Sequence, residues 1–359
     1  MIEFHPPSYY WAKAREHILK IEAELAIEDK YYVDREVAMK CIKFASITKL
    51  TAGEFGGKLF MFQQWQIEGI VEIFGVKHKH GELKGIRRYQ KALFYTAKKS
   101  GKTAFAAVLT AIYFFLDDEI AKECYTISSE LEQAKIMHKA FITLINQEEE
   151  LRDMVHITKQ PPKVSKMNGA FEDVYTALSA TADSKDGLNV SMLIVDEPHT
   201  FPSPDLYDIM ANGMAGRKQP LTIFTSTAGF DMQGFFYRNV YQYAKKLQSG
   251  AVKDDSFWYV LFEPTEEDLL IPNYYKDRDV IARCNPNFPI SPTCSYLESR
   301  IIQAEQSEAS MVSYLTKHLN VWCDKADTWI KHSVWTQNQS PIDEEALRGR
   351  LCYGGLDLA

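Results

Sequence analysis

Short runs of apolar residues alternate with stretches of helical periodicity through the middle of the chain. The runs predict six β-strands, at residues 92–97, 123–128, 174–178, 191–197, 221–227 and 257–262. Apolar residues recur at helical spacing in the segments 102–116, 130–147 and 203–213. Several strands are apolar at every position, which is typical of a sheet that is covered by helices on both faces. The pattern therefore predicts an α/β fold, a three-layer core with a mainly parallel sheet, over residues 59–265.

Helical patterns flank this core on both sides. The spacing of apolar residues predicts helices within residues 8–50, and so a helical N-terminal extension over residues 1–58 that ends in the Gly-rich stretch 51–57. The sequence pattern predicts a small helical linker region over residues 266–350, and residues 351–359 resemble the start of another strand. The longest apolar stretch, "AFAAVLTAIYFFL", is too short to cross a bilayer, so we expect a buried helix.

Composition and charge narrow the classes of protein. With 46% apolar residues, the 359-residue chain can bury a large core. The net charge of −7 argues against a protein that coats nucleic acids indiscriminately. Positive charge is nevertheless concentrated in residues 77–102, which carry nine Lys or Arg and one acid, Glu82; this run is either a solvated face or a surface that faces a polyanion. Six cysteines without C-x-x-C spacing favour reduced thiols in a cytosolic protein, and the N-terminus lacks the apolar segment of a signal peptide.

The predicted strand at residues 92–97 runs into the sequence "TAKKSGKT" and then into an apolar helix. This is the context of a phosphate-binding loop, although Thr96 stands where the pattern G-x-x-x-x-G-K-[ST] has its first glycine. Lys102 would contact the β- and γ-phosphates, and the Thr103 hydroxyl would bind Mg²⁺. The rest of the loop would cradle the phosphates at the helix N-terminus, through Ala97, Lys98, Lys99, Ser100 and Gly101. An ordinary helix start is the alternative interpretation.

The predicted strand at residues 191–197 ends in two acids, Asp196 and Glu197. Neighbouring side chains at a strand end point to opposite sides, so the two acids can have separate functions. We expect Asp196 to hold Mg²⁺ and Glu197 to orient and polarise the attacking water, because phosphoryl transfer depends on positioning and charge neutralisation. Ordinary capping acids at a strand end are the alternative.

The predicted strand at residues 221–227 ends in two hydroxyl residues, Ser226 and Thr227. Either hydroxyl could detect the γ-phosphate by hydrogen bonding and pass on its loss, which would couple hydrolysis to a conformational change. A strand that ends in an ordinary turn is the competing interpretation.

Together these motifs resemble the large subunit of tailed-phage terminases, the ATP-driven motors that package DNA. A missing first glycine and an early basic residue in the phosphate-binding loop are typical of these motors. The matching segments stand in the family's order and cover about residues 30–359; they are "FQQWQIEGIVEIFG", "GIRRYQKALFYTAKKSGKT", "SSELEQAK", "ALSATADSKDGLN", "LIVDEPH", "STAG", "ARCNPNFP", "HSVW" and "YGGLDLA". The resemblance implies a P-loop NTPase core of the ASCE, RecA-like type. It assigns Lys98, as the family's early basic residue, to the catalytic groups beside Lys102 and Glu197.

The resemblance also implies a function and partners. The chain would hydrolyse ATP with Mg²⁺ to translocate double-stranded DNA into a procapsid in the host cytoplasm, without any membrane association. Its partners would be the DNA, the portal ring, a small terminase subunit and further copies of the chain in a ring on the portal. Gln66 matches the family's upstream glutamine, which implies a contact with adenine, while a buried structural amide is the alternative. A basic finger from a neighbouring subunit would complete each site, and its candidates, each of which could equally be a surface charge, are Arg217, Lys185, Arg87 and Arg88.

Large subunits of this family usually continue into an RNase-H-like nuclease that uses two metal ions. The final residues "CYGGLDLA" resemble its first strand, and Asp357 matches its first metal-binding acid. The resemblance therefore leads us to expect a chain that stops at the start of the nuclease, either shortened or one half of a split protein. Such a chain would hold an incomplete nuclease site and would not cut DNA.

Two other functions are consistent with some of the motifs. The sequence "DEPH" matches the D-E-x-H of superfamily-2 helicases, but residues 265–359 look too short and too helical for the second RecA-like domain of a helicase. A P-loop protein could also bind nucleotide as a switch without turnover, although the presence of Glu197 argues against that function.

Overall fold

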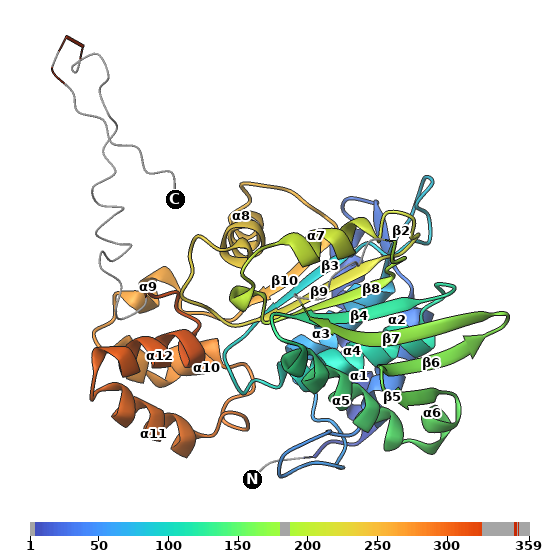
Figure 1. The fold of residues 1–359 in the computed structure, drawn as a ribbon, viewed down its shortest axis with the longest axis horizontal. Helices are drawn as coiled ribbons and strands as arrows, with labels where there is room; N and C mark the ends of the chain where they lie inside the picture. The colour runs from blue at the N-terminus through green and yellow to red at the C-terminus, as the bar shows by residue number, and fades with distance from the viewer. Residues whose placement is uncertain (1–3, 180–186, 325–347, 350, 352–359) are drawn as a thin grey trace.

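The computed structural model describes residues 4–179, 187–324, 348, 349 and 351 of the chain. Within these residues the main feature is an eight-stranded sheet with the order β10-β3-β9-β8-β4-β7-β6-β5 (Figure 1). All neighbouring pairs from β10 to β7 are parallel, and the last two pairs are antiparallel. The strands are β3 (Lys91–Tyr95), β4 (Glu123–Ser128), β5 (His156–Lys159), β6 (Pro162–Asn168), β7 (Phe171–Ser179), β8 (Met192–Asp196), β9 (Leu221–Ser226) and β10 (Phe257–Leu261).

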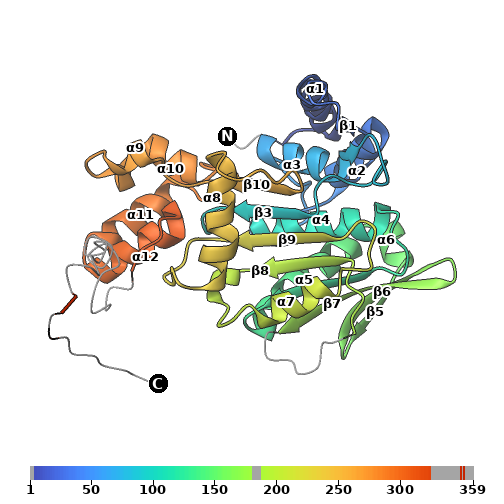
Figure 2. The same ribbon diagram turned by 90° about the horizontal axis from the view of Figure 1, so that it is seen from above.

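Helices cover both faces of the sheet, because alternate residues of each strand enter two different cores. On β3, Ala92 and Phe94 join the core that is built with α1 to α5, while Leu93 and Tyr95 join the core that is built with α7 and α8. Figure 2 looks onto the second face, with α7 and α8 in front of the strands. The helices are α1 (Pro7–Leu25), α2 (Arg35–Ile47), α3 (Gln64–Gly75), α4 (Lys102–Leu116), α5 (Leu131–Asn146), α6 (Glu149–Asp153), α7 (Asp205–Asn212) and α8 (Gln242–Gln248), the last preceded by a π-helical turn, η2 (Phe236–Tyr241). The predicted three-layer α/β core is confirmed.

Helix α4 is apolar on all sides because it lies inside the protein. Eleven of its fifteen residues are buried, and it contacts the sheet as well as α2 and α5. This burial confirms the prediction of a buried helix for the longest apolar stretch. None of the described helices is long and apolar enough to cross a membrane.

A small helical unit follows β10 and has its own core. It consists of α9 (Glu266–Leu269), a 3₁₀ turn, η3 (Tyr274–Lys276), α10 (Arg278–Cys284), α11 (Cys294–Ala304) and α12 (Glu308–Leu319). Its core includes Ile281, Leu297, Tyr314 and Leu319. Figure 1 shows α9 to α12 gathered to one side of the sheet, next to the carboxyl ends of its parallel strands. This unit is the described part of the predicted helical linker region.

Two features of the fold differ from the sequence prediction. The first 50 residues are not continuously helical, since Asp29 adopts φ 53° and β1 (Tyr31–Val33) then pairs with β2 (Val76–His78). The hairpin of β5 and β6 was also not predicted. Its polar sequences, "HITK" and "PKVSKMN", lie at the sheet edge, where only Val164 and Ser165 are buried, so the hydrophobic pattern is weak.

Several basic residues of the run 77–102 make contacts within the protein. Arg87 is 3% exposed and its guanidinium lies 2.6 Å from the Asp117 carboxylate, which is also buried. Lys77 pairs with Asp34 at 2.8 Å, and the Arg88 Nε donates to the Asp255 carbonyl oxygen. Lys77, Arg87 and Arg88 therefore serve contacts within the subunit and do not form a free basic surface.

Replacing Arg87 with Leu should lower the free energy of unfolding by about 3–5 kcal/mol, because the Asp117 carboxylate would stay buried without its cation. Urea denaturation measures this loss. Arg152→Leu is the control, since Arg152 pairs with acids at the surface and should change stability by at most about 1 kcal/mol. Equal losses in the two variants would contradict a structural role of the Arg87–Asp117 pair.

Candidate nucleotide-binding site

The phosphate-binding loop connects the carboxyl end of β3 to the N-terminus of α4. Thr96 and Ala97 leave the strand buried, and Gly101 precedes the helix with φ 75°, a conformation that favours glycine. Among the described residues, no hydrogen-bond acceptor is assigned to the backbone N–H groups of residues 99–104. Consecutive free N–H groups at a helix N-terminus form a concave anion site. The loop therefore fits a phosphate chain even without its first glycine.

The Lys102 ammonium turns back onto its own loop. It donates to the carbonyl oxygens of Thr96 at 2.8 Å and of Ala97 at 3.3 Å, and lies 3.9 Å from the Glu197 carboxylate. Burial lowers the pKa of Lys102, and the negative charges of Glu197 and Asp196 offset part of that shift. The structure thus brings the predicted lysine and the predicted acids together.

Asp196 and Glu197 lie at the end of β8 in different environments. Asp196 is 3% exposed and accepts hydrogen bonds from the Thr225 hydroxyl at 2.8 Å and from the Gln133 amide at 3.2 Å. Burial and the charge of Glu197 raise the pKa of Asp196. A cation beside Asp196 would favour its ionised form.

Burial and the neighbouring groups shift the pKa of Glu197 in opposite directions, and the effect of the neighbours is larger. Burial alone would raise its pKa, whereas the charge of Lys102 and the hydrogen bond from His199 lower the pKa to about 2. Glu197 adopts φ 49°, in the left-handed region that non-glycine residues rarely adopt, where β8 turns into the 3₁₀ turn η1 (Pro198–Thr200). The carboxylate is therefore fixed and ionised at neutral pH.

The ends of β8 and β9 are joined by side chains. The Thr227 N–H and hydroxyl both lie 3.4 Å from Glu197 Oε2, and His199 Nδ1 lies 3.1 Å from the same oxygen. His199 Nδ1 also lies 3.1 Å from the Ser226 hydroxyl oxygen. Because Nδ1 faces a carboxylate, we assign its proton to Nδ1, so that it donates. Of the two predicted coupling residues, Thr227 thus contacts Glu197 directly, and Ser226 is connected to Glu197 through His199.

His199 was not singled out from the sequence, although it belongs to the "DEPH" segment. Its ring is held by close packing as well as by hydrogen bonds. A Cβ on Gly229 would approach His199 Cβ and Cδ2 to 3.1 Å and the Trp322 ring to 3.2 Å. Only glycine fits at that position without displacing the histidine or the tryptophan.

Gln66 occupies the position of a structural amide. Its Oε1 accepts from the Gln63 N–H at 2.9 Å and completes a capping box at the start of α3. Its Nε2 has no partner among the described residues, and the side chain is fully buried. These contacts agree with the alternative of a buried structural amide, and the contact with adenine stays a prediction.

The helical unit holds the loop from outside. The Asn287 amide donates to the Ser100 carbonyl oxygen at 2.9 Å and accepts from the Trp65 indole N–H at 3.2 Å, and the Lys98 N–H donates to the Lys317 carbonyl oxygen at 2.8 Å. A second connection runs through Asn320, which accepts from the Ala228 N–H and, through its carbonyl oxygen, from the Tyr95 hydroxyl. Asn287 belongs to the segment "ARCNPNFP" that matches the family, although no role was predicted for it, and Asn320 carried no signal that sequence alone could separate from an ordinary loop residue.

The structure bears on three of the four candidates for a trans-acting basic finger. Arg87 is held inside the subunit by Asp117, and the Arg217 guanidinium donates to backbone carbonyl oxygens of residues 120, 121 and 189 and pairs with Glu119. These contacts argue against Arg87 and Arg217 as fingers. Arg88 packs on Tyr31 and Tyr89 and pairs with Asp255. Lys185, like Asp357 of the predicted nuclease, lies outside the described residues.

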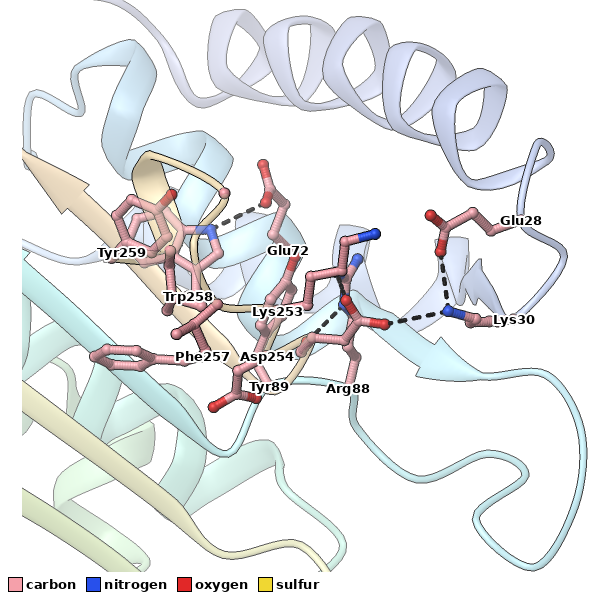
Figure 3. Close-up of a pocket in the computed structure, with 14 residues that line it drawn as sticks. Glu28, Lys30, Glu72, Arg88, Tyr89, Lys253, Asp254, Phe257, Trp258 and Tyr259 are labelled. Atoms are coloured by element: carbon pink, nitrogen blue, oxygen red, sulfur yellow. Dashed lines mark hydrogen bonds and ion pairs between the residues drawn. The ribbon is translucent and has the colours of Figure 1, made fainter. Parts of the chain in front are cut away.

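Another cavity, of about 750 Å³, lies at the opposite end of the strands, beside the beginning of β10 (Figure 3). Its charged groups neutralise one another: Lys30 pairs with Glu28 at 3.3 Å and with Asp255 at 3.7 Å. The Trp258 indole donates to Glu72 at 3.0 Å. This cavity belongs to the contact between the N-terminal helices and the sheet; its lining includes Arg88, a candidate for the basic finger, but none of the residues predicted to bind nucleotide or to catalyse hydrolysis.

Comparison with known proteins decides the family. The model of the terminase large subunit ATPase domain matches residues 65–246, just over half of the chain, and the model of the terminase large subunit endonuclease domain matches residues 251–359. The chain belongs to the terminase large subunit family. The expectation that a terminase endonuclease is missing is therefore wrong, because the endonuclease match begins at residue 251. The same match removes the basis for predicting no nuclease activity.

Two relatives in sequence and one solved structure are similar to parts of the chain. The chain is 29% identical over 140 residues to the terminase large subunit of Enterobacteria phage HK97, covering 38% of this chain and 27% of the relative. It is 27% identical over 175 residues to Protein YmfN of Escherichia coli (strain K12), covering 48% of this chain and 37% of the relative. The crystal structure of the HK97 large terminase matches the fold with a TM-score of 0.64 at 19% identity, covering 83% of this chain and 58% of that chain. Each match thus spans less than two thirds of the length of the relative.

The contact between His199 and Glu197 predicts a kinetic effect. Replacing His199 with Ala should lower kcat for ATP hydrolysis about 10- to 150-fold, the worth of one hydrogen bond to a charged group, with little change in KM. His199→Asn, whose amide can place an N–H near the position of Nδ1, should retain more activity. Steady-state kinetics on both variants checks this. A wild-type kcat in His199→Ala would contradict the positioning role.

Proposed function

We propose that this chain contains the ATPase of a DNA-packaging motor, which hydrolyses ATP to translocate double-stranded DNA into a procapsid. The observation that carries the proposal is the convergence of Lys102, Asp196 and Glu197 beside a loop with free backbone N–H groups. The match to the terminase ATPase domain supports the same function. A superfamily-2 helicase and a P-loop switch without turnover are not favoured by that match.

The residues present fit a nucleotide with Mg²⁺. Thr103 and Asp196 are the groups that would hold the ion, which would neutralise charge on the phosphates. Among the described residues no group of three or more His, Cys, Asp or Glu could hold a metal. The Thr103 hydroxyl and the Asp196 carboxylate suit Mg²⁺, which usually binds through one or two carboxylates, substrate phosphates and water.

The protein side chains act in a sequence that the geometry suggests. A phosphate on the loop would draw the Lys102 ammonium away from the Thr96 and Ala97 carbonyl oxygens and from Glu197. Losing that cation raises the pKa of Glu197 from about 2, so the carboxylate becomes a better acceptor for a proton of the attacking water. His199 and Thr227 keep the carboxylate in place, and Ser226 registers its position through His199. Lys98 would add positive charge at the same phosphates.

The wider assembly follows from the family and is also a proposal. The chain would act in the host cytoplasm as a ring on the portal, with a small terminase subunit and double-stranded DNA as partners. A basic residue of a neighbouring subunit would complete each site, for which Arg88 and Lys185 remain candidates. DNA contacts would be made mainly to phosphates, which makes affinity depend on salt.

Replacing Glu197 with Gln tests the proposal. The amide cannot accept the proton, so kcat should fall about 100- to 10,000-fold while the Kd for ATP stays close to the wild-type value. Phosphate release and fluorescent-nucleotide binding measure the two quantities. Glu149→Gln, at an exposed position of α6, is the matched control and should hydrolyse ATP normally.

Normal turnover by Glu197→Gln would remove Glu197 from the mechanism. A wild-type protein that binds ATP with negligible turnover, with DNA present, would instead indicate a switch. DNA strand separation driven by ATP would indicate a helicase.

A further inference from the structure

A cavity of about 520 Å³ lies between the phosphate-binding loop and helices α11 and α12. Its cationic lining comes from Lys98 and Lys99 of the loop, Arg300 of α11 and Lys317 of α12. We propose that this cavity binds a phosphate group of DNA or of a nucleotide. The inference rests on the proposed motor function, because that function supplies both sources of phosphate.

The charge of the cavity is unbalanced. No acidic side chain lines it, and within the described part of the chain none of its four cations has an ion-pair partner. Other cations of the same basic run have acidic partners, as Lys77 has Asp34 and Arg87 has Asp117. Four cations without an ion-pair partner among the described residues thus line one cavity next to the loop.

Buried polar atoms in the lining also lack partners. The Arg300 Nε and the His318 Nδ1 have no hydrogen-bond partner among the described residues, and His318 is only 6% exposed. Burial, followed by the charges of Arg300 and Lys317, lowers the pKa of His318 to about 4. A bound phosphate would offset the repulsion among the cations and accept charge-assisted hydrogen bonds from them.

The position of the cavity gives such binding a consequence for the motor. Lys98 and Lys99 belong to the loop that would cradle the nucleotide, and the Lys98 N–H is bonded to the Lys317 carbonyl oxygen at 2.8 Å. A phosphate held between the loop and α12 would contact both elements. Occupancy of the cavity would therefore alter the loop without contacting Lys102.

Two arms of one experiment separate the sources of phosphate. The variants Arg300→Gln and Lys317→Gln, made in the full chain, are compared with Lys139→Gln, which changes an exposed lysine of α5 away from the cavity. In the first arm, anisotropy of a labelled DNA duplex is measured over a KCl series. Loss of a DNA-phosphate contact should reduce the slope of log K against log salt by about 0.9. In the second arm, loss of a nucleotide contact should weaken fluorescent ATP binding about tenfold.

A change in either arm, absent in Lys139→Gln, supports the site and identifies its source. Unchanged binding of both DNA and ATP in correctly folded variants overturns it. If one of the two variants fails to fold, the other carries the test, because Arg300 and Lys317 lie on different helices. Failure here is distinct from failure of the motor function, since an ATPase that still depends on Glu197 would remain a motor ATPase without this phosphate site.

Discussion

The structure depends on one constraint, the meeting of three parallel strand ends at one edge of the sheet. β9 lies between β3 and β8, with Tyr95 paired in register with Ser226 and Asp196 with Thr225. Residues that follow these positions must therefore lie side by side, however far apart they are in sequence. Burial on both faces fixes the strands, so the lysine loop, the acids and the hydroxyls are held without help from a ligand.

As a consequence, the residues of the site are already in place, but the Lys102 ammonium is engaged by groups of the protein where a phosphate would bind it. The Lys102 ammonium is bound to loop carbonyl oxygens, and the same ammonium helps to keep Glu197 ionised. A phosphate competes for that ammonium, so binding and activation of the carboxylate are linked through one side chain. The helical unit is bonded to the same loop through Asn287 and to the end of β9 through Asn320, which gives nucleotide state a direct route out of the site.

The parts that sequence predicted well have strong physical signals. Continuous apolar strands such as β8 and the all-apolar helix α4 could be recognised because burial on all sides dictates their composition. The hairpin of β5 and β6 could not, since an exposed edge imposes little pattern. Arg87 illustrates another limit: sequence shows a positive charge but not Asp117, thirty residues away, which pairs with it inside the protein. His199 became visible only when folding placed it between Glu197 and Ser226.

The most direct measurement is a crystal or cryo-EM structure with a slowly hydrolysed ATP analogue and Mg²⁺. The account predicts the phosphates along the N–H groups of residues 99–104, with the Lys102 ammonium on phosphate oxygens and no longer on the Thr96 and Ala97 carbonyl oxygens. An analogue bound elsewhere, with Lys102 still on those carbonyl oxygens, would contradict it.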